Sequence, residues 1–241
     1  MILSRTMRPN DEMELLDAGK LLIQVHEAIQ MWYPPQHKCR TWEYALAIET
    51  LWTTFGHHYP LKVSDHGCGA GFLSPMLYWL GHDVTMYECW TFGDATDYMM
   101  EQMRKVGVAR GKHAGTYGMR GTPLGQLKEE DKGVDAAFCI STLEHIRNYQ
   151  EAFRDLLGTV KLGGMVFLTT DFAEDEVDHY HYSNLRAGKM FNDRTYHELF
   201  EIAQGMGFTA VGNKTDWGWT EECRMVHGYG FASMALLKEK E

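Results

Sequence analysis

A glycine-rich turn between a short apolar strand and a helix constrains the fold of this chain more than any other feature. The stretch reads KVSDHGCGAGFL, with glycine at every second position from Gly67 to Gly71. Glycine has no Cβ atom, so it permits a tight turn and lets a ligand approach the backbone closely. An apolar segment over 61–64 precedes the turn and a helical pattern over 72–80 follows it. This order predicts an α/β domain with a ligand site at the turn.

The rest of the chain continues the alternation of strands and helices. Expected strands cover 83–87, 134–140, 165–170, 208–211 and 229–237. Expected helices cover 11–31, 41–55, 97–106, 148–160 and a segment that opens with a capping box at Thr195 and ends near Gly205. Such alternation predicts a parallel sheet with helices on both faces and ligands at the carboxyl ends of its strands.

The charge around the turn distinguishes between cofactors. The dinucleotide fingerprint G-x-G-x-x-G would need a third glycine where Phe72 stands. Asp65 immediately precedes the turn, and a carboxylate there repels a pyrophosphate but attracts a cation. S-adenosylmethionine carries an ammonium and a sulfonium and no phosphate. Glu88 ends the next strand, 23 positions after Asp65, where an acid can accept hydrogen bonds from ribose hydroxyls.

A third block follows at residues 134–146. It is an apolar strand that ends in Ser141 and turns into a helix bearing Glu144 and His145. In this order and spacing, the three blocks resemble the class I S-adenosylmethionine-dependent methyltransferases over about residues 61–237. The resemblance implies a Rossmann-like, doubly wound, mostly parallel seven-stranded sheet with the last strand antiparallel. It also implies a helical extension over 1–58 and a methyltransferase domain over 59–241.

The resemblance implies S-adenosylmethionine as cofactor and S-adenosylhomocysteine as product. Gly67 and Gly69 would line the methionine moiety, Glu88 would hold the ribose, and residues 139–141 would flank the cofactor. The full set of expected cofactor residues is Tyr44, Asp65, His66, Gly67, Gly69, Glu88, Cys89, Gly121, Thr122, Cys139 and Ser141. Two positions depart from the family pattern, because Thr122 stands where an acid often contacts adenine and His66 stands where an aliphatic residue is usual.

His145 and His181 are the candidate catalytic bases near the methyl group, and a histidine that caps backbone is the structural alternative. Some related enzymes hold a divalent metal at an E-x-x-E-H segment. Here Ser141 replaces the first acid, so we expect no metal. The alternative metal site would combine Glu144, His145, His179 and His181. The polar segment 172–191 is a candidate lid over the acceptor.

Charge and composition narrow the acceptor. The net charge of −10 disfavours a grip on phosphate backbones, and the motifs of DNA methyltransferases are absent, so we expect no DNA partner. No apolar run is long enough to span a membrane, and five scattered cysteines favour reduced thiols in the cytoplasm. A homodimer is compatible with the sequence.

We therefore expect O- or N-methylation of a small molecule, such as a sugar or secondary metabolite. The alternatives are an RNA-end or protein methyltransferase, a catalytically silent S-adenosylmethionine-binding partner subunit, and a nicotinamide oxidoreductase. The charge and spacing of the glycine turn disfavour the last of these.

Overall fold

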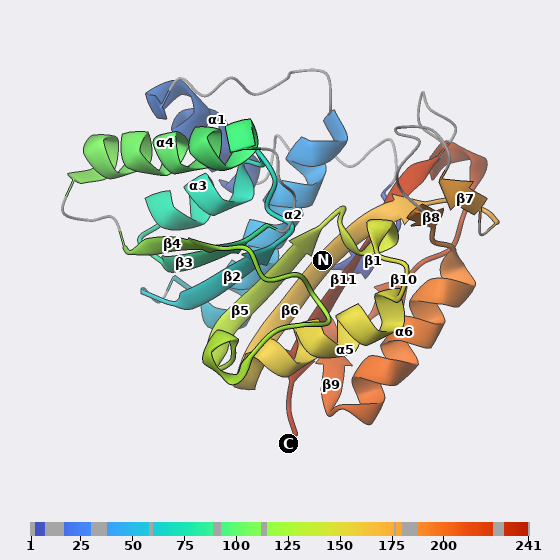
Figure 1. Ribbon diagram of the computed structural model, residues 1–241. Coiled ribbons are helices and arrows are strands. Elements are labelled where there is room, and N and C mark those ends of the chain that lie inside the picture. The colour runs from blue at the N-terminus through green and yellow to red at the C-terminus, as the bar shows by residue number, and fades with distance from the viewer. Residues whose placement is uncertain are drawn as a thin grey trace.

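A seven-stranded sheet forms the centre of the molecule in the computed structural model (Figure 1). The structure describes residues 3–7, 17–29, 38–57, 60–88, 93–111, 115–175, 177–179, 188–223 and 229–240. The strands are β2 (Lys62–His66), β3 (Asp83–Tyr87), β4 (Tyr117–Arg120), β5 (Val134–Ile140), β6 (Val160–Phe172), β9 (Phe208–Ala210) and β11 (Gly230–Lys238). Their order is β4-β3-β2-β5-β6-β11-β9, and β11 runs antiparallel to both β6 and β9, whereas the pairs from β4 to β6 are all parallel. The expected fold class is confirmed.

Helices cover both faces of this sheet. One layer contains α1 (Asp17–Ile29), α2 (Lys38–Phe55), α3 (Leu73–Trp79) and α4 (Gly93–Arg110). The other contains α5 (Tyr149–Thr159) and α6 (Asp193–Gly205), as Figure 1 shows. Short 3-10 turns lie at Glu129–Asp131, Leu143–His145, Val211–Asn213 and Glu221–Cys223. The helix expected over 11–31 is observed as α1, and residues 11–16 and 30–31 lie outside the described part of the chain.

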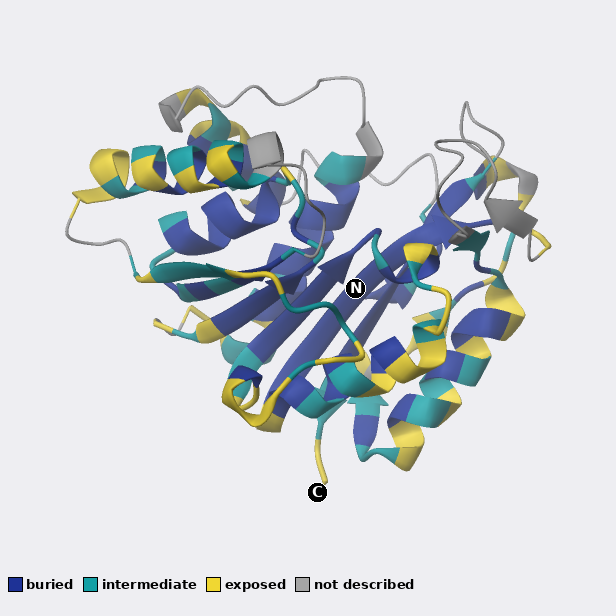
Figure 2. Cartoon of the chain, in the orientation of Figure 1, coloured by how far each residue is buried: buried dark blue, intermediate teal, exposed yellow. Residues whose placement is uncertain are grey.

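The central strands are apolar because both of their faces are covered. In β5, Phe138 and Ile140 belong to the core beneath α1–α4, whereas Ala137 and Cys139 belong to the core beneath α5 and α6. Figure 2 shows the strands buried along most of their length. A parallel strand between two helical layers is expected to read as a continuous apolar run, which is why this strand was predicted with its observed bounds.

Helix α2 is buried on all sides near its start. Every residue from 42 to 48 is buried, because the helix lies between α1 and the strands β6 and β11. The apolar residues of this stretch fit such a position, but Glu43 is also fully buried. A buried acid in a helix of this kind needs partners, and its partners lie at the ends of two strands.

Two local expectations are corrected by the structure. The cap of α6 is Asn192, whose side chain accepts a hydrogen bond from the Thr195 backbone N–H at 2.9 Å, so Thr195 lies inside the helix. The strand expected over 165–170 is longer in the structure, because β6 begins at Val160 and includes Gly163 and Gly164. A register shift in the pairing of β5 with β6 separates Val134 from Ala136 and accompanies this early strand start.

Five short strands were not predicted, and one of them is β4 (Tyr117–Arg120) at the edge of the main sheet. Strand β1 (Ser4–Arg5) pairs in parallel with β10 (Thr215–Asp216), and β7 (Val177–His179) pairs antiparallel with β8 (Gly188–Met190) inside the segment expected to be a lid. Two- and three-residue strands have no periodicity to read. Trp217, just after β10, is buried, and its indole N–H donates to the Ser233 carbonyl at 2.8 Å. That residue is therefore part of the core.

Candidate cofactor and active site

The glycine turn joins β2 to α3 through a compact set of backbone hydrogen bonds. The N–H groups of Gly67 and Cys68 both donate to the Tyr87 carbonyl, at 2.8 and 3.2 Å. Gly67 and Gly69 have φ angles of +73° and +50°, a left-handed conformation that favours glycine. A Cβ atom at Gly67 would lie 2.3 Å from side-chain atoms of Thr142. The turn therefore requires glycine for its backbone angle and for the close approach of Thr142.

Two acids accompany the turn, and both were predicted. The Glu88 carboxylate accepts a hydrogen bond from the Gly69 N–H at 2.8 Å. Asp65 is 3% exposed and accepts a hydrogen bond from the Ser74 hydroxyl at 2.6 Å. Burial raises the pKa of Asp65 to about 7, against the opposing effect of the Ser74 hydrogen bond. A buried acid of this kind would be stabilised in its charged form by a cation, as the ammonium of S-adenosylmethionine would supply.

Other expected cofactor residues lie around the same strand ends. The Glu88 N–H donates to the Arg120 carbonyl at 3.0 Å, and a Cβ at the next residue, Gly121, would lie 4.0 Å from the Glu88 carbonyl oxygen. Thr122 follows and is half-buried. On α2, the Tyr44 hydroxyl lies 3.0 Å from the position of a Cβ at Gly71. These residues thus meet at one edge of the sheet, whereas Cys89 lies outside the described residues.

His66 lies against β3. Its ring stacks on Tyr87 with centroids 4.4 Å apart, and Nε2 lies 3.0 Å from the Ser64 hydroxyl. The residue is fully buried, and burial lowers its pKa to about 3. The ring is therefore neutral at physiological pH, and a neutral aromatic ring fills a position where the resemblance implies an aliphatic side chain.

Because His66 is buried and neutral, we expect the folded protein to lose stability in acid. The unfolded chain protonates this histidine below pH 6.5 and the folded chain does not, so its contribution to stability is lost as the pH falls below 6.5. Between pH 7 and pH 5, we expect the free energy of unfolding of wild type to fall by about 2 kcal/mol more than that of His66→Phe. Urea unfolding at both pH values measures this difference, and His82, which is also buried, is present in both proteins. If the free energies of unfolding of the two proteins changed equally with pH, a buried neutral His66 would be contradicted.

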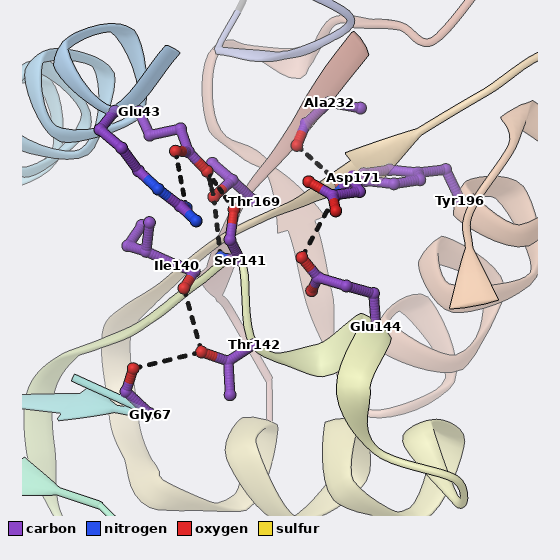
Figure 3. Close-up of polar contacts among 11 residues, drawn as sticks. Glu43, Gly67, Ile140, Ser141, Thr142, Glu144, Thr169, Asp171, Tyr196 and Ala232 are labelled. Atoms are coloured by element: carbon purple, nitrogen blue, oxygen red, sulfur yellow. Dashed lines mark hydrogen bonds and ion pairs between the residues drawn. The ribbon is translucent and has the colours of Figure 1, made fainter. Parts of the chain in front are cut away.

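A hydrogen-bond network that was not predicted joins α2 to the ends of β5 and β6 (Figure 3). Glu43 Oε1 accepts from the hydroxyls of Ser141 and Thr169, both at 2.5 Å, and Arg40 contacts Oε2 at 2.9 Å. Ser141 is the one non-glycine residue of the described chain with a positive φ, 44°. Such a conformation costs roughly 1–3 kcal/mol and clusters at functional sites. Sequence reasoning found Ser141 but had no signal for its partner on α2.

The segment after Ser141 places its two expected side chains differently. Glu144 is buried, and Figure 3 shows its carboxyl beside Asp171, whose N–H donates to Oε1 at 3.3 Å. Burial, and next the Asp171 carboxylate, raises the pKa of Glu144 well above its usual range. His145 is exposed. Cys139 is buried in the apolar core beneath α5 and α6.

The structure describes only part of the expected catalytic and metal set. His181 lies outside the described residues, and His179 is placed in β7 without a described side chain. Within the described part of the chain, no three histidine, cysteine or acidic residues form a group that could hold a metal ion. In the same described ranges, no helix is both long and apolar enough to cross a membrane.

The fold and the acidic glycine turn define the class of S-adenosylmethionine-dependent methyltransferases, and comparison with known proteins agrees. The family model described as a methyltransferase domain matches residues 36–212. The chain therefore belongs to the methyltransferase-domain family, whose methyl donor is S-adenosylmethionine. The match begins just before α2, so the family domain includes the helix that carries Tyr44 and Glu43.

The chain is also similar to individual methyltransferases, in sequence to curated relatives and in fold to solved structures. A ubiquinone biosynthesis O-methyltransferase of Bordetella avium is 29% identical over 127 residues, 52% of this chain and 48% of that protein. The chain thus spans about half the length of this curated relative. The structure of a Burkholderia thailandensis 1,6-didemethyltoxoflavin-N1-methyltransferase with bound S-adenosylhomocysteine has a TM-score of 0.60 and 17% identity, covering 97% of this chain and 92% of that one. Magnesium protoporphyrin IX methyltransferase from Synechocystis, with bound S-adenosylmethionine, gives 0.54 and 14%, covering 92% and 98%.

Proposed function

We propose that this protein transfers the methyl group of S-adenosylmethionine to an oxygen or nitrogen atom of a small-molecule acceptor. The observation that carries the proposal is the glycine turn flanked by Asp65 and Glu88. Gly67, Gly69 and Asp65 would hold the methionine part of the cofactor, and Glu88 would hold its ribose. The bound cofactor supplies an electrophilic methyl group, so the protein has to orient the acceptor and exclude water.

An oxygen acceptor is favoured over nitrogen. The curated relatives, from Bordetella and Rickettsia, are O-methyltransferases. Methylation of a hydroxyl releases a proton, which needs an acceptor near the reacting oxygen. Glu144 follows β5, and Asp171 lies near the end of β6. Sheets of this type bind ligands at the carboxyl ends of their strands, so both carboxyl groups lie at the end of the sheet where the acceptor would bind. His145 and His181 remain the proposed bases, on sequence grounds.

Calorimetric titration tests the cofactor part of the proposal. We expect wild-type protein to bind S-adenosylmethionine and S-adenosylhomocysteine with Kd on the order of micromolar, and not to bind NADH. Glu88→Ala removes a charged hydrogen-bond partner and is expected to weaken both by roughly tenfold to a hundredfold. Glu129→Ala, which removes an exposed acid that pairs with Lys132, is the matched control and should bind normally.

Methyl transfer itself is tested with methyl-labelled S-adenosylmethionine and a panel of hydroxylated aromatics, sugars and amines. Label in a hydroxyl-bearing product supports the proposal. Tight cofactor binding with no product from any acceptor would favour the silent partner subunit. Failure of the folded wild type to bind either sulfur ligand would show that the glycine turn is only a structural turn.

A further inference from the structure

Glu43 is a buried acid with no role in the proposed chemistry. It is 0% exposed, and both of its oxygens are used, Oε1 by Ser141 and Thr169 and Oε2 by Arg40. Ser141 directly follows β5 and Thr169 lies near the end of β6, so one carboxylate from α2 joins two neighbouring strand ends (Figure 3). Apolar residues of similar volume often stabilise a core as well as a buried ion pair does. Stability alone is therefore a weak explanation for this acid.

The network continues from Glu43 to the glycine turn. Ser141 has a positive φ and donates its hydroxyl to Glu43, and it is followed directly by Thr142. The Thr142 hydroxyl lies 3.0 Å from the Ile140 carbonyl oxygen and 3.3 Å from the Gly67 carbonyl oxygen, and can donate to either. Its side chain occupies the space that a Cβ at Gly67 would need. A shift of Ser141 would therefore move the side chain that packs directly against the turn.

Helix α2 also reaches the turn from a second direction. Tyr44, the residue after Glu43, is buried, and its hydroxyl lies 3.0 Å from the position of a Cβ at Gly71. Anchoring Glu43 to the strand ends thus fixes Tyr44 against one end of the turn and Thr142 against the other. Neither Asp65 nor Glu88 forms a described hydrogen bond with Glu43.

We propose that Glu43 is a positioning residue for the methyl donor. Its carboxylate joins α2 to the ends of β5 and β6 and thereby keeps the glycine turn in its cofactor-binding conformation. The inference rests on the proposed function, because it assigns Glu43 a task at the same cofactor site. A preorganised site binds more tightly because less ordering remains to be done on binding.

Two adjacent threonines of β6 provide a matched test. Thr169 and Thr170 are both fully buried, and valine at either position deletes a buried hydroxyl with little change of shape. The Thr169 hydroxyl donates to Glu43 and accepts from the Ser141 N–H at 3.2 Å, so it belongs to the network around Ser141. The Thr170 hydroxyl lies 3.0 Å from that of Tyr196, beneath the other helical layer. Calorimetric titration with S-adenosylhomocysteine, at a temperature where all variants are folded, compares the two.

We expect Thr169→Val to weaken S-adenosylhomocysteine binding about tenfold and Thr170→Val to change it less than about twofold. Thr169→Ser keeps the hydroxyl and should restore the wild-type Kd. Glu43→Gln keeps the size of the side chain but removes its charge, and it should weaken binding at least as much as Thr169→Val. It also tests the role if the valine variant does not fold.

Equal affinities of Thr169→Val and wild type, or equal losses in both valine variants, would overturn the positioning role and leave Glu43 as a structural acid. A wild-type protein that does not bind S-adenosylhomocysteine would instead overturn the proposed function, and the role of Glu43 with it. The two failures are therefore distinguished by the wild-type titration alone.

Discussion

Gly67→Ala is expected to abolish detectable binding of S-adenosylmethionine and to lower the free energy of unfolding by roughly 2–5 kcal/mol. Two effects add at this position. Alanine at a φ of +73° is strained, and its Cβ would lie 2.3 Å from the Thr142 side chain, closer than atoms can pack. The turn or Thr142 has to move, and either movement disrupts the site. Calorimetry and urea unfolding measure the two losses.

Gly133→Ala separates backbone strain from the clash. Gly133 has a φ of +81°, and nothing lies within 4 Å of its added Cβ. In this control, backbone strain alone should lower the free energy of unfolding, by about 1–2 kcal/mol, and the cofactor should bind normally. Adding Thr142→Gly to Gly67→Ala should recover part of the lost stability, since it removes the clashing side chain. If the two single glycine variants behave alike, the contact with Thr142 has no part in the effect.

The second large effect is a pH dependence of cofactor binding. The pKa of Asp65 is raised to about 7 in the free protein, because the carboxyl is buried. Only the ionised form attracts the ammonium of the cofactor, so the apparent Kd should rise about tenfold at pH 6 and about a hundredfold at pH 5. The cofactor keeps its own charges in this range, because its α-amino group titrates above pH 7. Titration calorimetry between pH 5 and pH 7 records the profile.

Asp65→Asn is the isosteric control for this profile. It should bind weakly at every pH, with no slope between pH 5 and pH 7. The folded protein holds a proton on Asp65 between pH 3.8 and about 7 that the unfolded chain lacks, so this residue makes wild type less stable as the pH rises through that window. At pH 8 and without cofactor, Asp65→Asn should therefore be more stable than wild type. A slope that persists in the variant would assign the titration to another group.

Much of the fold follows from local signals in the sequence. Strands β3 and β5 were predicted with their observed bounds, because each is a short apolar run closed by polar residues. The glycine turn, Asp65 and Glu88 form the predicted arrangement at one edge of the sheet, since adjacent parallel strands bring their carboxyl ends together.

The parts that sequence reasoning missed depend on contacts between distant segments. Glu43 and Ser141 are 98 positions apart, and no local pattern marks an acid in a buried helix as their link. Strand β4 and the pair β1–β10 are too short for periodicity, and their pairing requires the finished sheet. The Thr195 cap was misassigned because Asn192, three residues earlier, offers the same capping chemistry.

The position of β11 in the sheet has a consequence for folding during synthesis. This strand lies between β6 and β9, and it also carries the serine hydroxyl that donates to the Leu3 carbonyl near the other end of the chain. Until β11 has joined the sheet, β9 has no neighbour in it, and the edge of β6 is open to pairing with other chains. The nascent domain therefore passes through a stage with an uncovered central strand, when shielding by a chaperone matters most.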